Sequence, residues 1–326
     1  MNARSPAVSP VSPMLATLGS SSDIDEDEDD WAFEMKWDGI RAIATIAGGT
    51  VRLATRNGID VTATYPELAV LATQVRGDAV LDGEIVALGK LDRPDFGRLQ
   101  RRMKLTRKVD VDRVLAAVPV HYLVFDILET DGRSVAGQTY DERHAVLSTT
   151  VTSTDRVQVP PAFEGNLVAA VASSLKLGLE GVMAKKRDST YSPGRRSRAW
   201  IKIKHRRTQE VVVGGWRPGN GRRASTVGSL LLGVPSPDGL RYVGRVGTGF
   251  GDRDLEEITQ TLSKLWRAST PFVEMPSAEG RDAHWVTPSL VGEVEFAEWT
   301  PTDKLRQPSW RGWRPDKQPA DVVREG

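Results

Sequence analysis

The pattern of hydrophobic and polar positions divides the chain into two blocks. In the first block, from Trp31 to about residue 207, short strand-like runs alternate with a few helical ones. Residues 80–88 and 121–128 show the alternation that predicts strands. Residues 65–75 and 166–177 carry apolar side chains at helical spacing. We therefore expect a first domain that mixes strands with a few helices.

The second block begins near Gln209 and is richer in strands. Strand-like runs, separated by turns with Gly, Pro or Asn, occur at residues 210–216, 227–234, 240–247 and 292–300. Residues 252–267 place apolar side chains on one helical face, and Asp252 stands where a helix cap is expected. Several strands around one helix predict a small barrel such as an OB-fold.

The first 30 residues lack this periodicity. Residues 1–13 hold three prolines among serines, and residues 23–30 hold seven carboxylates and one apolar residue. We expect a flexible lead-in followed by a solvated acidic loop. The predicted organisation is a lead-in with acidic loop over 1–30, one domain over 31–207 and a barrel domain over 208–326, with the basic stretch 205–207 at the boundary.

Composition narrows the class of protein. The 326 residues include no cysteine, which excludes disulfide scaffolds, cysteine zinc sites and thiol nucleophiles. The best candidate for an apolar span, residues 167–179, is interrupted by Ser173, Ser174 and Lys176, so no membrane segment is predicted. The N-terminus shows no signal-peptide core, and we expect a soluble protein of the cytoplasm.

Net charge at first argues against a nucleic-acid partner, because 44 Lys and Arg nearly balance 43 Asp and Glu. The average hides an uneven distribution, since seven acidic residues lie in the loop 23–30 and 36 lie elsewhere. Between Lys185 and Arg207 there are ten basic residues and one acidic residue. A strip of this kind suits contact with the phosphates of DNA.

The segment around Lys36 is the first with candidate chemistry. If it is a strand, Phe33 and Met35 face the core. Glu34 and Lys36 then point to the other side, and Asp38 lies just beyond. A lysine beside carboxylates at the end of a strand can act as a nucleophile when its amine is neutral. Taken alone, the segment is explained better by a salt-bridged surface lysine.

Four further segments carry acidic, aromatic or basic residues in suggestive positions. Asp82 and Glu84 share one strand face, which suits a divalent cation or a ribose but also an ordinary polar outer face. Phe125 is placed either to stack on a base or to fill the core. Glu180 and Lys185 mark the start and end of the fourth segment. In the fifth, two lysines on one face invite a triphosphate, although lysines also protect edge strands.

The order of these segments is more specific than any one of them. Covalent nucleotidyltransferases are the superfamily of polynucleotide ligases and messenger-RNA capping enzymes. Their motifs, in the same order along the chain, resemble Lys36-x-Asp38-Gly39, Asp82-Gly83-Glu84, Phe125-Asp126, Glu180-Gly181 and Lys202-x-Lys204. The superfamily's additional and final motifs resemble Thr55-Arg56-Asn57-Gly58 and Arg314-Pro315-Asp316-Lys317. The resemblance covers nearly the whole chain.

Within this superfamily the chain is most similar to ATP-dependent DNA ligases, on residues 180–185 and 200–204. The lack of cysteine separates it from NAD-dependent ligases, which carry a four-cysteine zinc module. The ligase domain of the bacterial multifunctional end-joining ligase resembles it further at 188–191, 214–216, 227–231, 244–249 and 310–312. The resemblance implies an α+β fold, in which an adenylation domain with antiparallel sheets and flanking helices precedes an OB-fold β-barrel.

The resemblance also implies roles for the motif residues. The expected catalytic residues are Lys36, Asp38, Lys202 and Lys204. The expected ATP-binding residues are Glu34, Lys36, Arg41, Arg56, Glu84, Phe125, Glu180, Lys202, Lys204, Arg314 and Lys317. The expected ligands for Mg²⁺ or Mn²⁺ are Glu84, Glu180 and Asp82. The expected DNA contacts are Arg41, Arg56, Lys185, Arg195, Arg196 and Arg198.

The implied reaction is ATP-dependent sealing of breaks in duplex DNA through AMP bound to Lys36, in double-strand break repair. The implied partners are nicked or broken DNA, a Ku end-binding protein and separate polymerase and nuclease modules, with the chain acting as a monomer in the bacterial cytoplasm. Two alternatives stay open at this point. The first is another enzyme, either an RNA ligase or a GTP-dependent capping-type nucleotidyltransferase. The second is a non-catalytic DNA-end-binding module that retains only the fold.

Overall fold

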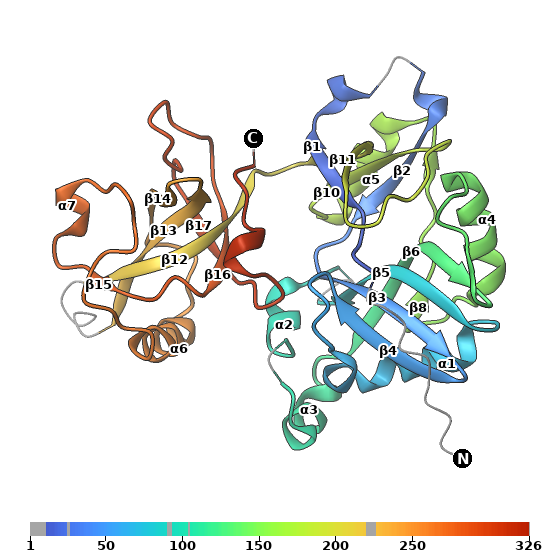
Figure 1. Cartoon of the computed structure of the whole chain (residues 1–326), viewed down its shortest axis with the longest axis horizontal. Helices are drawn as coiled ribbons and strands as arrows, with labels where there is room; N and C mark the ends of the chain where they lie inside the picture. Colours follow the sequence, from blue (N-terminus) through green and yellow to red (C-terminus); the bar gives the residue numbers. More distant parts are fainter. Residues whose placement is uncertain (1–10, 25–26, 90–92, 104, 220–225, 326) are drawn as a thin grey trace. The chain divides into compact units, whose positions relative to one another are not determined.

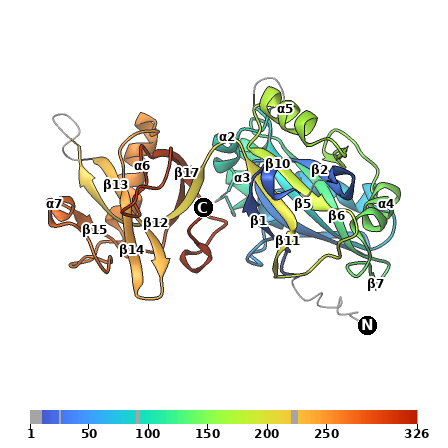
Figure 2. The same ribbon diagram turned by 90° about the horizontal axis from the view of Figure 1, so that it is seen from above.

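The computed structural model describes residues 11–24, 27–89, 93–103, 105–219 and 226–325. The chain divides into two compact units, Met1–His205 and Arg206–Gly326, which we call the first and second unit. Their boundary falls two residues before the expected one. Figures 1 and 2 show two β-sheets with helices against them in the first unit and one main sheet in the second.

The first sheet of the first unit, which we call the Lys36 sheet, is mainly antiparallel. Its strands, in spatial order, are β1 (Leu15–Gly19), β11 (Arg196–Lys204), β10 (Gly181–Lys186), β2 (Trp31–Lys36) and β9 (Phe163–Glu164). Helix α5 (Leu167–Leu177) packs on β2 and β10. Its start is capped by Asn166, whose side chain accepts the Ala169 N–H at 2.8 Å. The apolar faces of helix and sheet meet in a buried cluster that includes Phe33, Val182, Ile201 and Leu167.

Strand β1 corrects the expectation that residues 1–30 lie outside the folded domain. It pairs in parallel with β11, and the Met14 side chain just before it is completely buried. The predicted acidic loop 23–30 also includes regular structure, because the 3-10 helix η1 (Ser21–Asp23) ends at its first residue and η2 (Glu28–Asp30) lies within it. Glu28 accepts the Leu167 N–H at the start of α5 at 2.9 Å. The predicted lead-in over residues 1–10 lies outside the described residues.

The second sheet of the first unit carries the motif acids. Its strands are β4 (Thr50–Thr55), β3 (Ile40–Ala47), β5 (Ala79–Ala87), β6 (Val120–Thr130) and β7 (Arg133–Ser134), with β8 (Val157–Gln158) paired in parallel to β6. Helix α4 (Tyr140–Thr150) packs on β6, and the shorter helices are α2 (Phe96–Gln100) and α3 (Lys108–Leu115). The strands predicted at 80–88 and 121–128 are confirmed as β5 and β6.

The helix predicted over residues 65–75 is only partly correct. The segment forms the 3-10 helix η4 (Pro66–Val70), with Pro66 in its first turn, followed by the single α-turn α1 (Leu71–Gln74). A second 3-10 helix, η3 (Thr62–Thr64), precedes it. Apolar spacing alone does not separate the two helix types, because both place every third or fourth residue on one face.

A small apolar cluster joins the two sheets of the first unit. Met14, Tyr191 and Trp200 come from the side of the Lys36 sheet, and Ile43, Val80 and Leu128 come from the second sheet. Tyr191 and Trp200 meet edge to face, with ring centroids 5.6 Å apart. Burial of this cluster holds the facing motif residues of the two sheets at a defined separation.

The second unit is built on one antiparallel sheet. Its strands are β14 (Gly239–Val246), β13 (Val227–Ser236), β12 (Thr208–Pro218), β16 (Val291–Glu295) and β17 (Ser309–Trp313), with β15 (His284–Trp285) paired to β12. Helix α6 (Asp252–Ser263) packs on β13 through Leu255, Ile258 and Leu262. The remaining short helices are α7 (Ser277–Gly280) and the 3-10 helix η7 (Pro319–Asp321).

Three predicted boundaries in the second unit need correction. The cap of α6 is Gly251 rather than Asp252, and the Gly251 N–H donates to the Asp254 carboxylate at 2.9 Å. The helix ends at Ser263, before the predicted residue 267. The strand predicted over 292–300 ends at Glu295.

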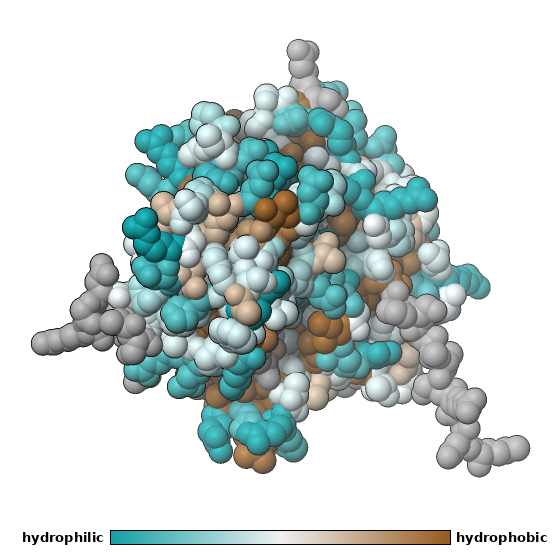
Figure 3. Space-filling model, turned by 60° about the vertical axis from the view of Figure 1, so that its left-hand side comes forward, coloured by the Kyte–Doolittle hydropathy of each residue, from teal (hydrophilic) through white to brown (hydrophobic). Residues whose placement is uncertain are grey.

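The described part of the chain has no helix long and apolar enough to cross a membrane. Figure 3 shows one face of the molecule, on which hydrophobic residues are scattered among hydrophilic ones. The large hydrophobic side chains that are exposed, such as Val168 and Trp266, belong to different units.

Candidate active site

The register of the Lys36 sheet places the motif residues in rows across three strands. Gly181 of β10 pairs with Lys36 of β2 on one side and with Lys204 of β11 on the other. Two residues along, Met183 pairs with Glu34 and Lys202. Residues two apart on a strand point to the same face, so segments far apart in sequence present their charged side chains together.

Glu180 directly precedes Gly181, the central residue of the first row, and its side chain joins the two lysines of that row. Its carboxylate contacts Lys36 Nζ and lies 3.3 Å from Lys204 Nζ. The three side chains are only 18%, 9% and 10% exposed for Lys36, Glu180 and Lys204 respectively. The structure thus brings together a lysine amine, a carboxylate and a second cation in a place with little water. Their attraction is stronger there than at the surface.

Gly181 makes this row possible because it has no side chain. A Cβ atom at this position would lie 2.0 Å from the Ile203 carbonyl oxygen and 2.9 Å from Lys204 Cα. β10 and β11 therefore pack closely next to Glu180. Gly39 plays a similar part in the turn after β2, where a Cβ would lie 2.3 Å from the Ile85 carbonyl oxygen. Asp38, next to it, is half-buried.

Lys185 does not lie where a DNA contact requires it. Its side chain is 1% exposed, and its Nζ lies 2.8 Å from one Glu34 oxygen and 2.9 Å from the other. The same Nζ donates to the Phe125 carbonyl oxygen at 3.2 Å and lies 4.4 Å from the Trp200 ring centroid. The Glu34 carboxylate also accepts from the Tyr140 hydroxyl at 2.8 Å. The structure corrects the DNA assignment of Lys185, because this side chain is committed to the interior.

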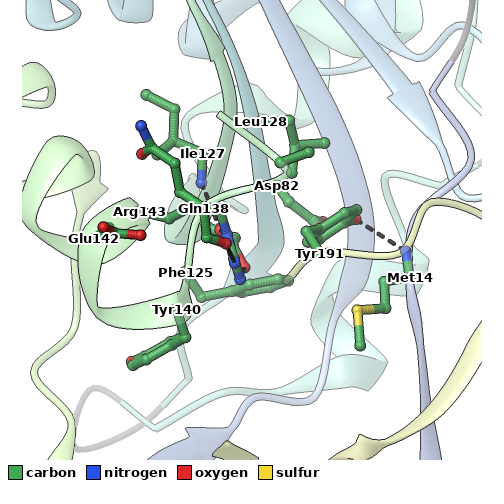
Figure 4. Close-up of polar contacts among 12 residues, drawn as sticks. Met14, Asp82, Phe125, Ile127, Leu128, Gln138, Tyr140, Glu142, Arg143 and Tyr191 are labelled. Atoms are coloured by element: carbon green, nitrogen blue, oxygen red, sulfur yellow. Dashed lines mark hydrogen bonds and ion pairs between the residues drawn. The ribbon is translucent and has the colours of Figure 1, made fainter. Parts of the chain in front are cut away.

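Arg41 and Asp82 form a second enclosed pair between the sheets. Arg41 donates two hydrogen bonds to the Asp82 carboxylate, at 2.9 and 2.6 Å, and one to the Met14 carbonyl oxygen at 2.6 Å. The Tyr191 hydroxyl donates to Asp82 at 2.6 Å and accepts from the Met14 N–H at 2.9 Å (Figure 4). Burial opposes the charge of Arg41, but Asp82 holds the pKa of Arg41 above its usual range. Burial, with Asp82 beside it, raises the pKa of Tyr191.

Phe125 is the extra residue of a β-bulge. In the pairing of β5 with β6, Asp82 is opposite Asp126 and Gly83 is opposite Val124, so Phe125 has no partner. Bulges re-aim side chains and are common beside active sites. The Phe125 ring meets Trp200 edge to face at 6.2 Å and lies 5.4 Å from the Arg41 guanidinium carbon.

The acidic residues expected to bind a metal do not form a complete site by themselves. No group of three or more potential metal-ligating residues occurs among the described residues. Asp82 is engaged by Arg41 and Tyr191, which argues against its role as a metal ligand. Mg²⁺ is usually bound through one or two carboxylates together with substrate phosphates. Glu84, which pairs in register with Arg41, and Glu180 fit only a site that a nucleotide completes.

The arginines expected to contact DNA occupy more open positions. Arg195, Arg196 and Arg198 are exposed, and Arg56 lies half-buried in the turn after β4. Arg196 bonds to the Ala16 carbonyl oxygen, and Arg198 lies 3.0 Å from Asp23. At such exposure these contacts are weak and leave the guanidinium groups able to exchange partners.

In the second unit, the final motif forms a cluster of charges. Arg314 donates two hydrogen bonds to Asp316, at 2.9 and 2.7 Å, and one to Glu293 at 2.9 Å. Lys317 lies 2.9 Å from Glu210. Although burial opposes it, the charges of Lys317 and Arg314 hold the pKa of Glu210 below its ordinary value. Burial likewise opposes the charge of Asp316, but Arg314 holds the pKa of Asp316 below its ordinary value.

Sequence reasoning missed the residues that complete these clusters. Arg143 binds buried Asp126 at 2.7 and 2.9 Å, and Tyr140 supports Glu34. His205 Nε2 lies 2.9 Å from the hydroxyl oxygen of Ser174, which is fully buried. Burial lowers the pKa of His205. The sequence marked Ser174 only as an interruption of the apolar run 167–179, and the partners of the other residues are defined by the tertiary fold.

Comparison with known proteins identifies the family to which the chain belongs. A family model described as "ATP dependent DNA ligase domain" matches residues 13–204, and one described as "ATP dependent DNA ligase C terminal region" matches residues 223–317. The chain therefore belongs to the ATP-dependent DNA ligase family. The predicted fold class, an α+β nucleotidyltransferase domain followed by an OB-fold domain, is confirmed.

Individual relatives narrow the family. The chain is 45% identical over 317 residues to the multifunctional non-homologous end joining protein LigD of Mycobacterium bovis, covering 97% of this chain and 40% of that protein. It is 35% identical to a DNA ligase of Natronomonas pharaonis, covering 96% and 57%. A mycobacterial DNA ligase D solved with ATP and MES has a TM-score of 0.67 at 42% identity, over 97% of this chain and 98% of that one. The chain thus spans less than half the length of its LigD relatives.

Proposed function

We propose that this protein joins a 5′-phosphate to a 3′-hydroxyl at breaks in duplex DNA, with ATP as the source of AMP. Membership of the ATP-dependent DNA ligase family supports this activity. The observation that carries the proposal is the side-chain cluster of Lys36, Glu180 and Lys204. It combines a nucleophilic amine, a proton acceptor and a cation for phosphate in one nearly buried cluster.

The first step transfers AMP to the protein. The neutral amine of Lys36 attacks the α-phosphorus of ATP, a P–N bond forms, and the bond to the β-phosphate oxygen breaks as pyrophosphate leaves. Glu180 contacts Lys36 Nζ and is placed to accept the proton that the amine loses. Lys202 and Lys204 neutralise charge on the phosphates, while Phe125 stacks on adenine.

The next two steps act on DNA. An oxygen of the 5′-phosphate attacks the AMP phosphorus, and the P–N bond to Lys36 breaks. The 3′-hydroxyl then attacks the activated 5′-phosphorus, which forms the phosphodiester and releases AMP. In this scheme Asp38 supports the third step, Arg41 and Arg56 hold the AMP and 5′-phosphates, and exposed Arg195, Arg196 and Arg198 contact the DNA backbone. Arg41 is enclosed against Asp82, so its role requires a phosphate to reach that pair.

Other groups complete the nucleotide site in this proposal. Bound with the nucleotide, Mg²⁺ or Mn²⁺ supplies further charge neutralisation, and Glu84 and Glu180 are the residues that would hold it. Arg314 and Lys317 of the second unit orient pyrophosphate during the first step, which requires the two units to rearrange between steps.

The LigD relatives are named for non-homologous end joining. We infer that this protein acts in the same kind of double-strand break repair, as a monomer in the bacterial cytoplasm. A Ku end-binding protein and polymerase and nuclease modules are the expected partners.

Nucleotide labelling and nick sealing test the proposal together. Incubation with ATP labelled at the α-phosphate is expected to label the protein, and a nicked duplex is expected to be sealed. Lys36→Ala should abolish both, whereas Lys176→Ala, at an exposed lysine of α5, should change neither. Labelling by GTP instead of ATP would favour a capping-type enzyme, and sealing of RNA but not DNA would favour an RNA ligase. Undiminished sealing by Lys36→Ala would refute the mechanism.

A further inference from the structure

His205 lies directly behind the proposed active site, at the junction of the two units. It follows Lys204, the last residue of β11, and Arg206 begins the second unit. Its ring is half-buried, and its Nε2 lies 2.9 Å from the hydroxyl oxygen of Ser174 on α5. None of the motif roles uses either residue.

The direction of these hydrogen bonds follows from the chemistry of the groups. The Ser174 hydroxyl has one hydrogen, and it donates this hydrogen to the Gly181 carbonyl oxygen at 2.7 Å. Toward His205 the hydroxyl oxygen can therefore act only as an acceptor. His205 Nε2 must carry a hydrogen, which assigns the ring's tautomer without reference to pH.

A second contact ties His205 to the same segment. Its backbone N–H donates to the Glu180 carbonyl oxygen at 3.0 Å. Two consecutive carbonyl groups, those of Glu180 and Gly181, are thus held by one residue, directly by its backbone and through Ser174 by its ring. The Ser174 carbonyl accepts the Leu179 N–H at 3.0 Å, so the segment that leads into β10 is held from the helix side as well.

This segment has little room to move. Ser174 is fully buried, and a Cβ at Gly181 would already collide with Ile203. The Glu180 side chain of this segment reaches both Lys36 and Lys204. A shift of the Glu180 backbone would therefore change the contact between its carboxylate and the Lys36 amine. Reaction rates are sensitive to displacements of about 1 Å between reacting groups.

We propose that His205 is a positioning residue for the adenylylation of Lys36. Together with Ser174 it fixes the backbone that carries Glu180, and it anchors the end of the first unit so that movement of the following chain does not disturb Glu180. This inference rests on the proposed function, since it assigns a role within the lysine adenylylation step.

The test compares three substitutions in the full chain. Gln carries its amide nitrogen as many bonds from Cα as His carries Nε2, so His205→Gln retains the donor, whereas His205→Asn is too short. Ser174→Ala removes the acceptor. Single-turnover adenylylation at varied ATP concentration gives the maximal rate and the ATP concentration at half-maximal rate for each variant. His121→Asn is the control for the same substitution on the other sheet, where His121 bonds to the Asp155 carbonyl oxygen at 2.6 Å through Nδ1 rather than Nε2.

We expect His205→Asn and Ser174→Ala to lower the maximal rate about 10-fold, the loss of one well-placed hydrogen bond, with little change in the ATP requirement. His205→Gln should retain most of the wild-type maximal rate. The double variant His205→Asn/Ser174→Ala should be no slower than the slower of its two single variants. Thermal unfolding of each variant shows whether it folds. If Ser174→Ala fails to fold, the comparison of Gln with Asn at position 205 decides.

Two results would overturn the inference. One is a maximal rate unchanged by His205→Asn, and the other is a rate for His205→Gln as low as that for His205→Asn. Labelling of the wild-type protein by ATP distinguishes these outcomes from failure of the proposed function, because a wild-type chain that takes no AMP refutes the proposed function itself.

Discussion

Buried ion pairs between distant segments organise the first unit at the scale of single residues. Arg143 and Asp126 are 0% and 1% exposed and share two hydrogen bonds. Lys185 and Glu34 are similarly enclosed. Such a pair adds little net stability, but removing one partner leaves an uncompensated buried charge. Asp126 lies beside Phe125 in the motif, and its pair with Arg143 joins β6 to α4.

Replacing Asp126 with Asn tests this structural role. Asn cannot accept both guanidinium hydrogen bonds and leaves Arg143 charged and buried, so the free energy of unfolding should fall by about 3–5 kcal/mol. Urea unfolding measures the change. Asp141→Asn, which breaks an exposed pair with Arg187, should cost less than about 1 kcal/mol. Equal losses in the two variants would show that Asp126 is not the buried partner described here.

At the scale of elements, the close pairing of β10 with β2 and β11 brings the charged side chains of Lys36, Glu180 and Lys204 together. Strand alternation predicted which side chains share a face, and the pairing decided which of them meet. The close approach of β11 at Gly181 leaves no space for a side chain. The bulge at Phe125 in β6 is a second local departure from regular pairing, and it turns one side chain toward the facing sheet.

Gly181→Ala should separate β10 from β11 beside Glu180. The added Cβ would meet backbone at 2.0 Å, and overpacking of this kind costs about 1–3 kcal/mol. We expect a lower free energy of unfolding together with a slower adenylylation of Lys36. At Gly137, where nothing lies within 4 Å of an added Cβ, the same change should alter stability by no more than about 0.5 kcal/mol. A wild-type rate and stability for Gly181→Ala would contradict the observed register.

The charge cluster at the end of the second unit makes this unit sensitive to acid. The folded pKa of Glu210 is below its ordinary value of 4.5, because Lys317 and Arg314 favour the carboxylate. The Glu210 carboxylate therefore stabilises the fold fully at a pH above its ordinary pKa. This contribution is lost as the pH falls through the pKa that Glu210 has in the folded protein.

Glu210→Gln removes this contribution. We expect the variant to be less stable than the wild type at pH 7, and the difference in unfolding free energy to shrink as the pH falls below about 4. Denaturant unfolding of both chains across this pH range measures it. A difference that stays constant with pH would show that the Glu210 charge does not contribute to stability.

At the scale of the whole molecule, the proposed reaction uses residues of both units. Lys36, the proposed nucleophile, belongs to the first unit, and Arg314 and Lys317 belong to the second, where acids of their own unit hold them. If they orient pyrophosphate, they are needed when ATP reacts and not when the DNA strands are joined.

Lys317→Ala should therefore separate the steps. Loss of one charged contact to the leaving group predicts adenylylation slower by about 10-fold or more, with sealing of a pre-adenylated nick nearly unchanged. Arg306→Ala, which breaks an exposed pair with Glu298, serves as the control and should affect neither step. Equal losses in both steps for Lys317→Ala would count against a role confined to the first.

The sequence by itself determined the family, the two-domain order and the motif residues. Alternation and helical spacing depend on local geometry, and the motif residues occur in a set order along the chain. Lys36, Glu180, Lys202 and Lys204 could be named in advance because each lies in a short segment with its own pattern.

Only the tertiary structure decided which charged residues lie at the proposed reaction site and which form ion pairs in the interior. Lys185 was expected to meet DNA, but it pairs with Glu34 across 151 positions of sequence, and Arg41 and Asp82 enclose each other. The same holds for β1, whose strand character comes from its pairing with β11. These contacts join distant segments, and burial and pairing energies depend on the whole fold rather than on local pattern.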